Sequence, residues 1–229
     1  SLLPEIRRLV PGRLVVFKGP EVAARYPEPH HRPFVDLDLL AEHPEGAYQA
    51  LLDAGWKESH PPANFASTHQ LPALFRGTDS LLIEVHRRLA WPAWVDAPSP
   101  RSLLARAVMS RLPVDGLETL HPVDHTLQLA AHSWLHRPLR RLVDFLDLEL
   151  MRRECEGSEL RAKARDARLG GLWRLTEGVL DHLFHDDHPR PLALAILGSH
   201  LQRLRPTSRS GDILAKALGR FLVTTPVRA

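Results

Sequence analysis

The chain has 229 residues, of which 44% are hydrophobic and 25% charged, and this composition fits one large or two small folded domains with a true core. Its formal net charge of +3 is too small to indicate nucleic-acid binding by itself, and it suits phosphate-bearing small molecules equally well. We expect a cytoplasmic protein without a membrane span or internal disulfide, because no run of 18 apolar residues occurs, the first residues lack a signal-peptide pattern, and Cys155 is the single cysteine.

The first hundred residues carry patterns of short strands and helices in alternation. Residues 2–9 predict a short helix, and the run RLVVF at residues 13–17 predicts a strand that ends at Lys18-Gly19-Pro20. Residues 34–40 (FVDLDLL) alternate apolar and acidic side chains, which is the period of a strand. The other elements expected in this part are helices at residues 21–26 and 45–54 and strands at residues 56–59, 69–76 and 80–87.

From about residue 101 the sequence changes character, and leucine, alanine and arginine recur at helical spacing. No strand pattern interrupts this half. The proline-rich residues 91–100 predict a boundary between an α/β core at residues 1–95 and a helical region at residues 96–229. Helices are expected near residues 101–110, 122–136, 139–154, 158–168, 171–185, 191–204 and 211–222.

Asp36 and Asp38 are the first candidate site residues. Side chains two positions apart in a strand point to the same face, so the two carboxylates lie side by side and repel each other. A divalent cation removes that repulsion, and hard oxygen ligands at this spacing suit Mg²⁺. A lone Asp-x-Asp is a weak signal, because two aspartates on an exposed strand face give the same pattern.

Glu84 is a third carboxylate in a similar setting, inside the apolar run SLLIEVHRR. A buried, unpaired glutamate is costly, so Glu84 needs a partner, and it can join Asp36 and Asp38 if the two strands are neighbours. His86 would share its face. Three such carboxylates on neighbouring strands are what two-metal phosphoryl or nucleotidyl transfer requires.

A series of short motifs occurs in a fixed order, which is more specific than any one of them. The motifs are Phe17-Lys18-Gly19, Tyr26-Pro27, Arg32-Pro33, Asp36-Leu37-Asp38, Asp53-Ala54-Gly55-Trp56 and Ile83-Glu84-Val85-His86. With this order of motifs, residues 15–40 resemble the uncharacterised nucleotidyltransferase branch of the DNA polymerase β-like superfamily. The resemblance continues to about residue 150, through a helix that contains His132 and the run RRLVD.

The resemblance implies an α+β fold, in which a small mixed sheet with flanking helices precedes an all-helical region. It also implies Asp36 and Asp38 as metal ligands and Glu84 as the third carboxylate. The wider superfamily places Gly-Ser after the first strand to hold the triphosphate, whereas this chain has Lys18-Gly19. Gly19 can still allow close approach of a phosphate, and Lys18 supplies a charge for it.

Several other residues have two readings each. Arg32 either contacts a phosphate or pairs with Asp36, while His30 and His31 are favoured as exposed loop residues. His132 and His136 have metal-ligand spacing, but a hydrogen-bonding role for His132, with Asp144 as a possible partner, is favoured. Structural roles without chemistry are also favoured for three further groups. The acidic and histidine cluster at residues 182–188 is expected to be a helix end, and Cys155 to be structural. A solvated helix face is expected for the arginines at 137, 140, 141, 152 and 153.

Together these observations predict a Mg²⁺-dependent enzyme that moves a nucleoside monophosphate from an NTP to a hydroxyl of a small-molecule, peptide or protein acceptor. Asp36, Asp38 and Glu84 would hold the metal, and Lys18, Gly19 and Arg32 the phosphates. Two alternatives remain open: a catalytically weak nucleotide-binding module, and a toxin- or antitoxin-type interaction protein. No membrane association is expected, and the sequence does not indicate a nucleic-acid or protein partner.

Overall fold

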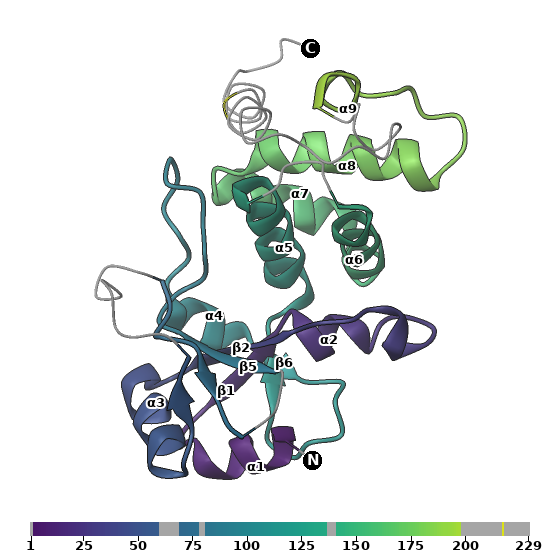
Figure 1. Ribbon diagram of the computed structural model, residues 1–229. Helices are drawn as coiled ribbons and strands as arrows, with labels where there is room; N and C mark the ends of the chain where they lie inside the picture. Colours follow the sequence, from purple (N-terminus) through teal and green to yellow (C-terminus); the bar gives the residue numbers. More distant parts are fainter. Residues whose placement is uncertain (1, 60–68, 78–80, 137–140, 198–216, 218–229) are drawn as a thin grey trace. The chain divides into compact units, whose positions relative to one another are not determined.

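The computed structural model describes residues 2–59, 69–77, 81–136, 141–197 and 217 (Figure 1). The chain divides into two compact units. The first comprises Ser1–Leu89 with Pro98–Asp124, and the second Ala90–Ala97 with His125–Ala229. The sequence boundary after residue 95 stays a prediction.

The first unit is built on a seven-stranded mixed sheet with the strand order β3-β4-β5-β2-β1-β7-β6. The central strand β2 runs antiparallel to β1 and parallel to β5, and β1 runs parallel to β7. This sheet, with its flanking helices and the helices that follow, confirms the predicted α+β class. The strands are β1 (Leu14–Phe17), β2 (Asp36–Ala41), β3 (Lys57–Glu58), β4 (Leu74–Phe75), β5 (Leu82–His86), β6 (Val108–Met109) and β7 (Glu118–Thr119).

The two faces of the sheet differ in character because side chains alternate along each strand. Leu37 of β2 is buried in a hydrophobic core with Ile6 and Leu51, which belong to α1 (Leu2–Leu9) and α3 (Pro44–Asp53). Asp36 and Asp38, on either side of Leu37 in β2, therefore point to the opposite face. The remaining helices of this unit are α2 (Gly19–Ala23), the 3₁₀ helix η1 (Pro29–His31) and α4 (Pro100–Arg106).

The expectation of no strand beyond about residue 95 is wrong. The helix expected at 101–110 ends at Arg106, and Val108 and Met109 form β6, which pairs with β7. Pairing of β7 with β1 joins both strands to the sheet. A two-residue strand has too few side chains to show a period of two, so the partner strand decides its conformation.

In its described part the second unit consists of helices and their connections, together with the helix-free segment Ala90–Ala97. α5 (Pro122–His136), α6 (Leu142–Arg152), α7 (Gly157–Asp166), α8 (Gly170–Phe184) and α9 (Leu192–Leu197) lie within a few residues of the predicted helices. The end of the helix expected at 191–204, and that at 211–222 apart from residue 217, lie outside the described residues.

No helix in the described part of the chain is long and apolar enough to cross a membrane.

Candidate active site

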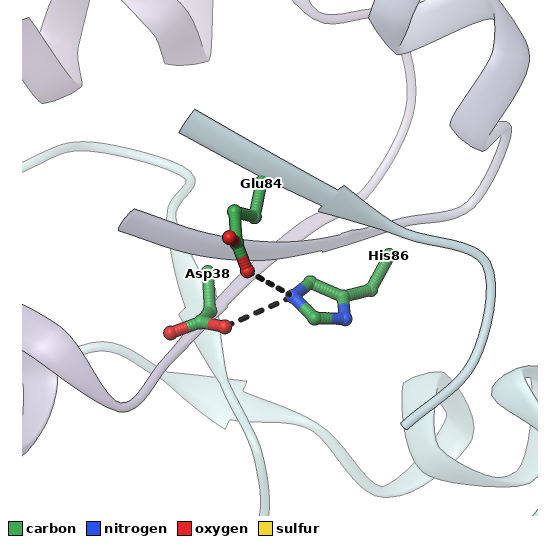
Figure 2. A group of neighbouring side chains, drawn as sticks. All are labelled: Asp38, Glu84 and His86. Atoms are coloured by element: carbon green, nitrogen blue, oxygen red, sulfur yellow. Dashed lines mark hydrogen bonds and ion pairs between the residues drawn. The ribbon is translucent and has the colours of Figure 1, made fainter. Parts of the chain in front are cut away.

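Acidic side chains gather where β2 and β5 run side by side. The parallel register places Asp38 directly opposite Glu84, and Asp36 lies two residues before Asp38 on the same face. Figure 2 shows Asp38, Glu84 and His86 pointing toward one another from these two strands. The structure thus brings all three sequence-predicted carboxylates to one face, and it adds an imidazole.

Asp38 is the most buried of the three carboxylates, with a side chain that is 1% exposed. Its Oδ1 atom lies 2.6 Å from the ammonium of Lys18 and 2.9 Å from Nε2 of His86. Its Oδ2 atom is buried and has no hydrogen-bond partner among the described residues. One of the two oxygens of this buried carboxylate therefore accepts no hydrogen bond. Burying such an oxygen costs free energy unless a ligand binds to it.

His86 is held between the carboxylates and two aromatic rings. Its ring packs against Phe17, with centroids 5.0 Å apart, and against His69, at 5.6 Å. Its Nε2 atom faces Asp38 and also lies 3.7 Å from Oε2 of Glu84. An ionised carboxylate can only accept, so Nε2–H donates to Asp38. His86 thus fixes the orientation of Asp38.

The electrostatics of the three carboxylates differ. Burial and the charge of Asp38 raise the pKa values of both Asp36 and Glu84 above their ordinary range. Burial also opposes the charge of Asp38, but the Lys18 ammonium and the His86 hydrogen bond outweigh it and lower its pKa to about 2. The site therefore carries more negative charge than its protein partners neutralise.

The turn after β1 brings Lys18 and Gly19 against β2. Lys18 has φ 59° and ψ −151°, a conformation that residues other than glycine rarely adopt. Gly19 has φ 39°, and a Cβ there would lie 3.1 Å from the carbonyl oxygen of Asp36. Gly19 is therefore required by the close approach of the turn to β2.

Arg32 follows η1, shortly before β2, and is half-buried. Its positive charge lowers the pKa of Asp36, against the larger effects of burial and of Asp38. Arg32 therefore lies close enough to Asp36 to act on it electrostatically. His30 and His31 of η1 are exposed, in agreement with their reading as loop residues.

Among the residues that the structure describes, Asp38, Glu84 and His86 form a group whose side chains could offer ligand atoms to one metal ion. One carboxylate oxygen or ring nitrogen from each lies within 4.8 Å of the others, and Asp36 is not in this group. The carboxylates of Asp38 and Glu84, with the partnerless Oδ2 atom of Asp38, offer hard oxygen atoms that fit a divalent cation, while Nε2–H of His86 holds Asp38 in place. Sequence reasoning placed His86 on this face without assigning it to the site. Its spacing of two residues from Glu84 was the signal for it.

Comparison with known proteins assigns the family. The model of a family described as "Uncharacterised nucleotidyltransferase" matches residues 12–185. The chain belongs to this family. No curated protein matches it. A solved structure of the antibiotic-resistance factor ANT(2'')-Ia is similar at 13% identity and a TM-score of 0.48, over 79% of this chain and 90% of that one.

Membership makes the chain a nucleotidyltransferase, with an NTP and an acceptor as its substrates. The matched residues begin just before β1 and end just after α8, so they include the carboxylates of the first unit and the helices α5 to α8. The sequence-based identification of the family is thereby confirmed.

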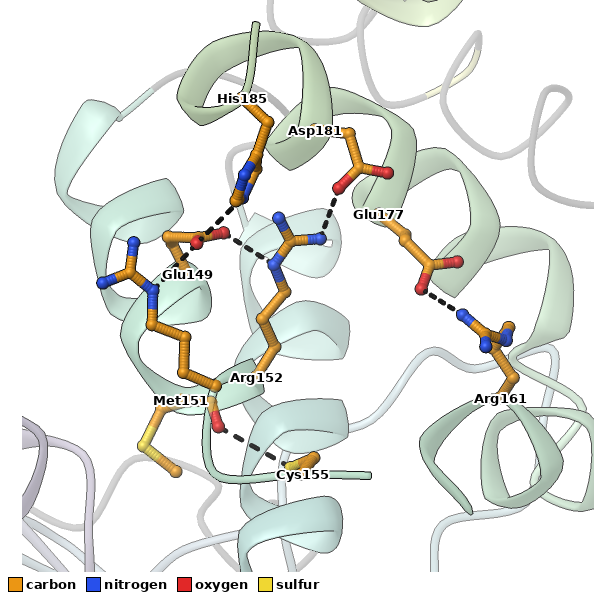
Figure 3. A network of polar contacts seen from close by, with 9 residues as sticks. Glu149, Met151, Arg152, Cys155, Arg161, Glu177, Asp181 and His185 are labelled. Atoms are coloured by element: carbon orange, nitrogen blue, oxygen red, sulfur yellow. Dashed lines mark hydrogen bonds and ion pairs between the residues drawn. The ribbon is translucent and has the colours of Figure 1, made fainter. Parts of the chain in front are cut away.

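The charged residues of the helical unit of this nucleotidyltransferase form a different kind of cluster (Figure 3). Glu149 of α6 is almost fully buried. It accepts hydrogen bonds from Arg152 at 2.6 Å, Arg153 at 3.0 Å and His185 at 3.2 Å. Arg152 also donates to Asp181 of α8 at 2.7 Å, which ties the two helices together. Both arginines are thus engaged in the fold, and the reading of Arg152 as part of a solvated face is wrong, because its side chain is 14% exposed.

The remaining candidates in this unit have local partners. His182 of α8 contacts the backbone oxygen of His188, and α8 ends one residue before His185, so this segment is a helix end. The Sγ atom of Cys155 donates to the Met151 carbonyl and lies 3.5 Å from the Thr126 hydroxyl, in agreement with a structural role.

Other predictions for this unit remain predictions. Asp144 pairs with Arg141 at 3.8 Å. The His136 side chain and residues 137 and 140 lie outside the described part of the chain. The pairing of His132 with His136 as metal ligands therefore stays untested.

Proposed function

We propose that this nucleotidyltransferase transfers a nucleoside monophosphate from an NTP to a hydroxyl of a small-molecule, peptide or protein acceptor, with Mg²⁺ held by Asp36, Asp38 and Glu84. The observation that carries the proposal is the pairing of Asp38 with Glu84 on adjacent strands, with a buried Asp38 oxygen that has no partner among the described residues.

The excess negative charge of the site supports this assignment. Burial and mutual repulsion raise the pKa values of Asp36 and Glu84, and a bound cation would relieve both effects. Divalent cations in such a site lower the pKa of the attacking hydroxyl and neutralise the leaving pyrophosphate. The protein then has mainly to position its substrates, because phosphoryl chemistry needs little covalent help.

The phosphates are assigned to Lys18, Gly19 and Arg32. Lys18 and Arg32 supply positive charge beside the carboxylates, because both act electrostatically on Asp36 and lower its pKa. Gly19 keeps the turn beside β2 free of a side chain. These residues would take the place of the serine that the wider superfamily uses. His86 donates to Asp38 and holds that carboxylate in its orientation.

Calorimetric titration with ATP, GTP, CTP and UTP, each with and without Mg²⁺, tests the proposal. We expect Mg²⁺-dependent binding of one NTP, and its loss in the double variant Asp36→Asn/Asp38→Asn. The double variant Asp53→Asn/Asp115→Asn is the matched control, because it removes the same charge from exposed positions of the same unit. Equal NTP binding by both double variants would contradict the site.

We also propose a cytoplasmic location, which the single cysteine supports. Fractionation of cells that express the chain tests it.

A further inference from the structure

The ammonium of Lys18 pairs with Oδ1 of Asp38, a carboxylate that belongs to the proposed metal site. We infer that Lys18 is a positioning residue that neutralises Asp38 in the free protein, leaves it when a divalent cation binds Asp38 and Glu84, and then takes the NTP triphosphate. The inference rests on the proposed function and adds the order of the binding events to it. The Lys18 ammonium pairs first with the Asp38 carboxylate and then with the triphosphate, and binding of the cation causes the change of partner.

The first argument is competition for one buried group. Lys18 Nζ lies 2.6 Å from Asp38 Oδ1, and the Asp38 side chain is 1% exposed. Two positive charges a few ångströms apart repel far more strongly in a buried site than in water. A divalent cation on Asp38 and the Lys18 ammonium on the same carboxylate therefore disfavour each other.

The second argument is that the fold holds the backbone of Lys18 on both sides, whereas its side chain reaches toward solvent. Phe17, just before it, is paired with Asp38 in the sheet, and Gly19, just after it, packs against the Asp36 backbone. The Lys18 carbonyl accepts hydrogen bonds from the amides of Glu21 and Val22. The lysine stem has four carbons, and the side chain is 14% exposed, so the ammonium has a route toward solvent.

The third argument is the backbone conformation of Lys18. Its φ of 59° and ψ of −151° lie in a region that glycine adopts without strain and that costs other residues free energy. Backbone strain of this kind concentrates at functional sites. At this strained position, lysine places a positive charge directly beside the carboxylates, which glycine could not do. The charge therefore explains why a lysine is present in spite of the strain.

The exchange links the two ligands of the site. If a cation releases Lys18 for the triphosphate, bound NTP in turn keeps Lys18 away from Asp38 and strengthens cation binding. Such linkage is reciprocal by thermodynamic necessity. Each ligand alone therefore binds more weakly than it does in the presence of the other.

Acetylation rates of individual lysines test the exchange directly. The chain has four lysines, Lys18, Lys57, Lys163 and Lys216, and exposed Lys57 serves as the internal reference. The protein is treated with a limiting amine-acetylating reagent, and each site is quantified by peptide mass spectrometry. We expect Lys18 to react slowly without metal and several-fold faster with Mg²⁺. It should react slowly again when the protein holds both Mg²⁺ and the α,β-methylene analogue of the NTP that it binds. Lys57 should not change.

Calorimetry of Mg²⁺ binding in the same samples separates the two proposals. If Mg²⁺ binds in the absence of an NTP and the acetylation rate of Lys18 does not change, the exchange is wrong and the proposed function stands. If Mg²⁺ binds neither alone nor with an NTP, the exchange and the proposed function are both wrong.

A pair of variants gives a second readout. Lys18→Met should bind Mg²⁺ alone more tightly than the wild type, by about tenfold, and lose part of the gain in Mg²⁺ affinity that an NTP confers, because direct coordination of Mg²⁺ by the phosphates remains. Lys57→Met, which removes the same charge, should change neither quantity. Full retention of the NTP-induced gain in Lys18→Met would overturn the inference. Should that variant not fold, the acetylation rates of the wild-type protein decide.

Discussion

Two buried carboxylates, one in each unit, show how the same chemical group serves function in one place and stability in the other. Glu149 in the helical unit uses both oxygens: Oε1 accepts from Arg153 and His185, and Oε2 from Arg152 (Figure 3). Asp38 in the sheet unit uses Oδ1 alone, and its Oδ2 has no partner among the described residues. The surroundings of a buried charge, more than its burial, distinguish the two roles.

The neighbours of the two carboxylates reinforce the difference. Asp36 and Glu84 stand beside Asp38 on the same face of the sheet, and repulsion and burial raise the pKa values of both. Cationic side chains surround Glu149 and compensate its burial. The sheet unit thus keeps an uncompensated negative charge that a cation can use, whereas the helical unit uses its charges to hold α6 and α8 together.

The largest expected effect is on activity. Asp38→Asn should lower nucleotidyl transfer by more than about a hundredfold, because even the outer-shell partners of a metal ligand change affinity or activity 10- to 100-fold. Transfer of label from an α-³²P-labelled NTP to an extract that contains acceptors measures it. Circular dichroism and the melting temperature show whether the fold is kept. A folded variant with wild-type transfer would remove Asp38 from the site.

The next effect is on stability, in the other unit. Glu149→Gln should lower the free energy of unfolding by about 2 kcal/mol, since it leaves the mostly buried Arg152 without the carboxylate that its guanidinium pairs with. Urea denaturation measures the change. Glu177→Gln is the control, because the ion pair of Glu177 with Arg161 is more exposed and should contribute less than about 1 kcal/mol. Equal effects of the two variants would break the contrast between the units.

Removal of a carboxylate from the sheet unit should have the opposite sign. Glu84→Gln takes away a charge that burial and Asp38 disfavour, so in the presence of EDTA it should raise the melting temperature, by roughly 2–4 °C for about 1 kcal/mol in a chain of this size. Differential scanning calorimetry measures the shift. A lower melting temperature would mean that Glu84 stabilises the fold as Glu149 does.

The smallest effect is the pH dependence of stability without metal. The raised pKa values of Asp36 and Glu84 give stability that is present below their ordinary values of 3.8 and 4.5 and is lost as the pH rises through the raised values. Asp38 has the reverse sign. Its contribution is present above 3.8 and is lost as the pH falls through about 2.

In denaturation curves in EDTA between about pH 4 and 7, the wild type should therefore lose more stability, or gain less, with rising pH than Glu84→Gln does. The control Glu177→Gln should leave the slope as it is. The same slope in Glu84→Gln and the wild type would show that Glu84 titrates normally.

The sequence by itself determined the features that depend on neighbouring residues along the chain. The alternation in FVDLDLL predicted a strand with Asp36 and Asp38 on one face, and the helical spacing beyond residue 120 predicted α5 to α8 within a few residues. The ordered motifs from Lys18-Gly19 to Glu84 identified the family, which the family match confirms. Each of these signals is local, or is a series of local signals in order.

Only the tertiary structure decided the features that depend on which strands are neighbours. The parallel register of β2 and β5 sets Glu84 opposite Asp38 and brings His86 to the same carboxylate. The turn after β1 places the Lys18 ammonium there as well. The strands β6 and β7 likewise form because they pair with each other and with β1. Pairing across tens of residues leaves no periodic trace in the sequence, because each strand supplies only half of the geometry.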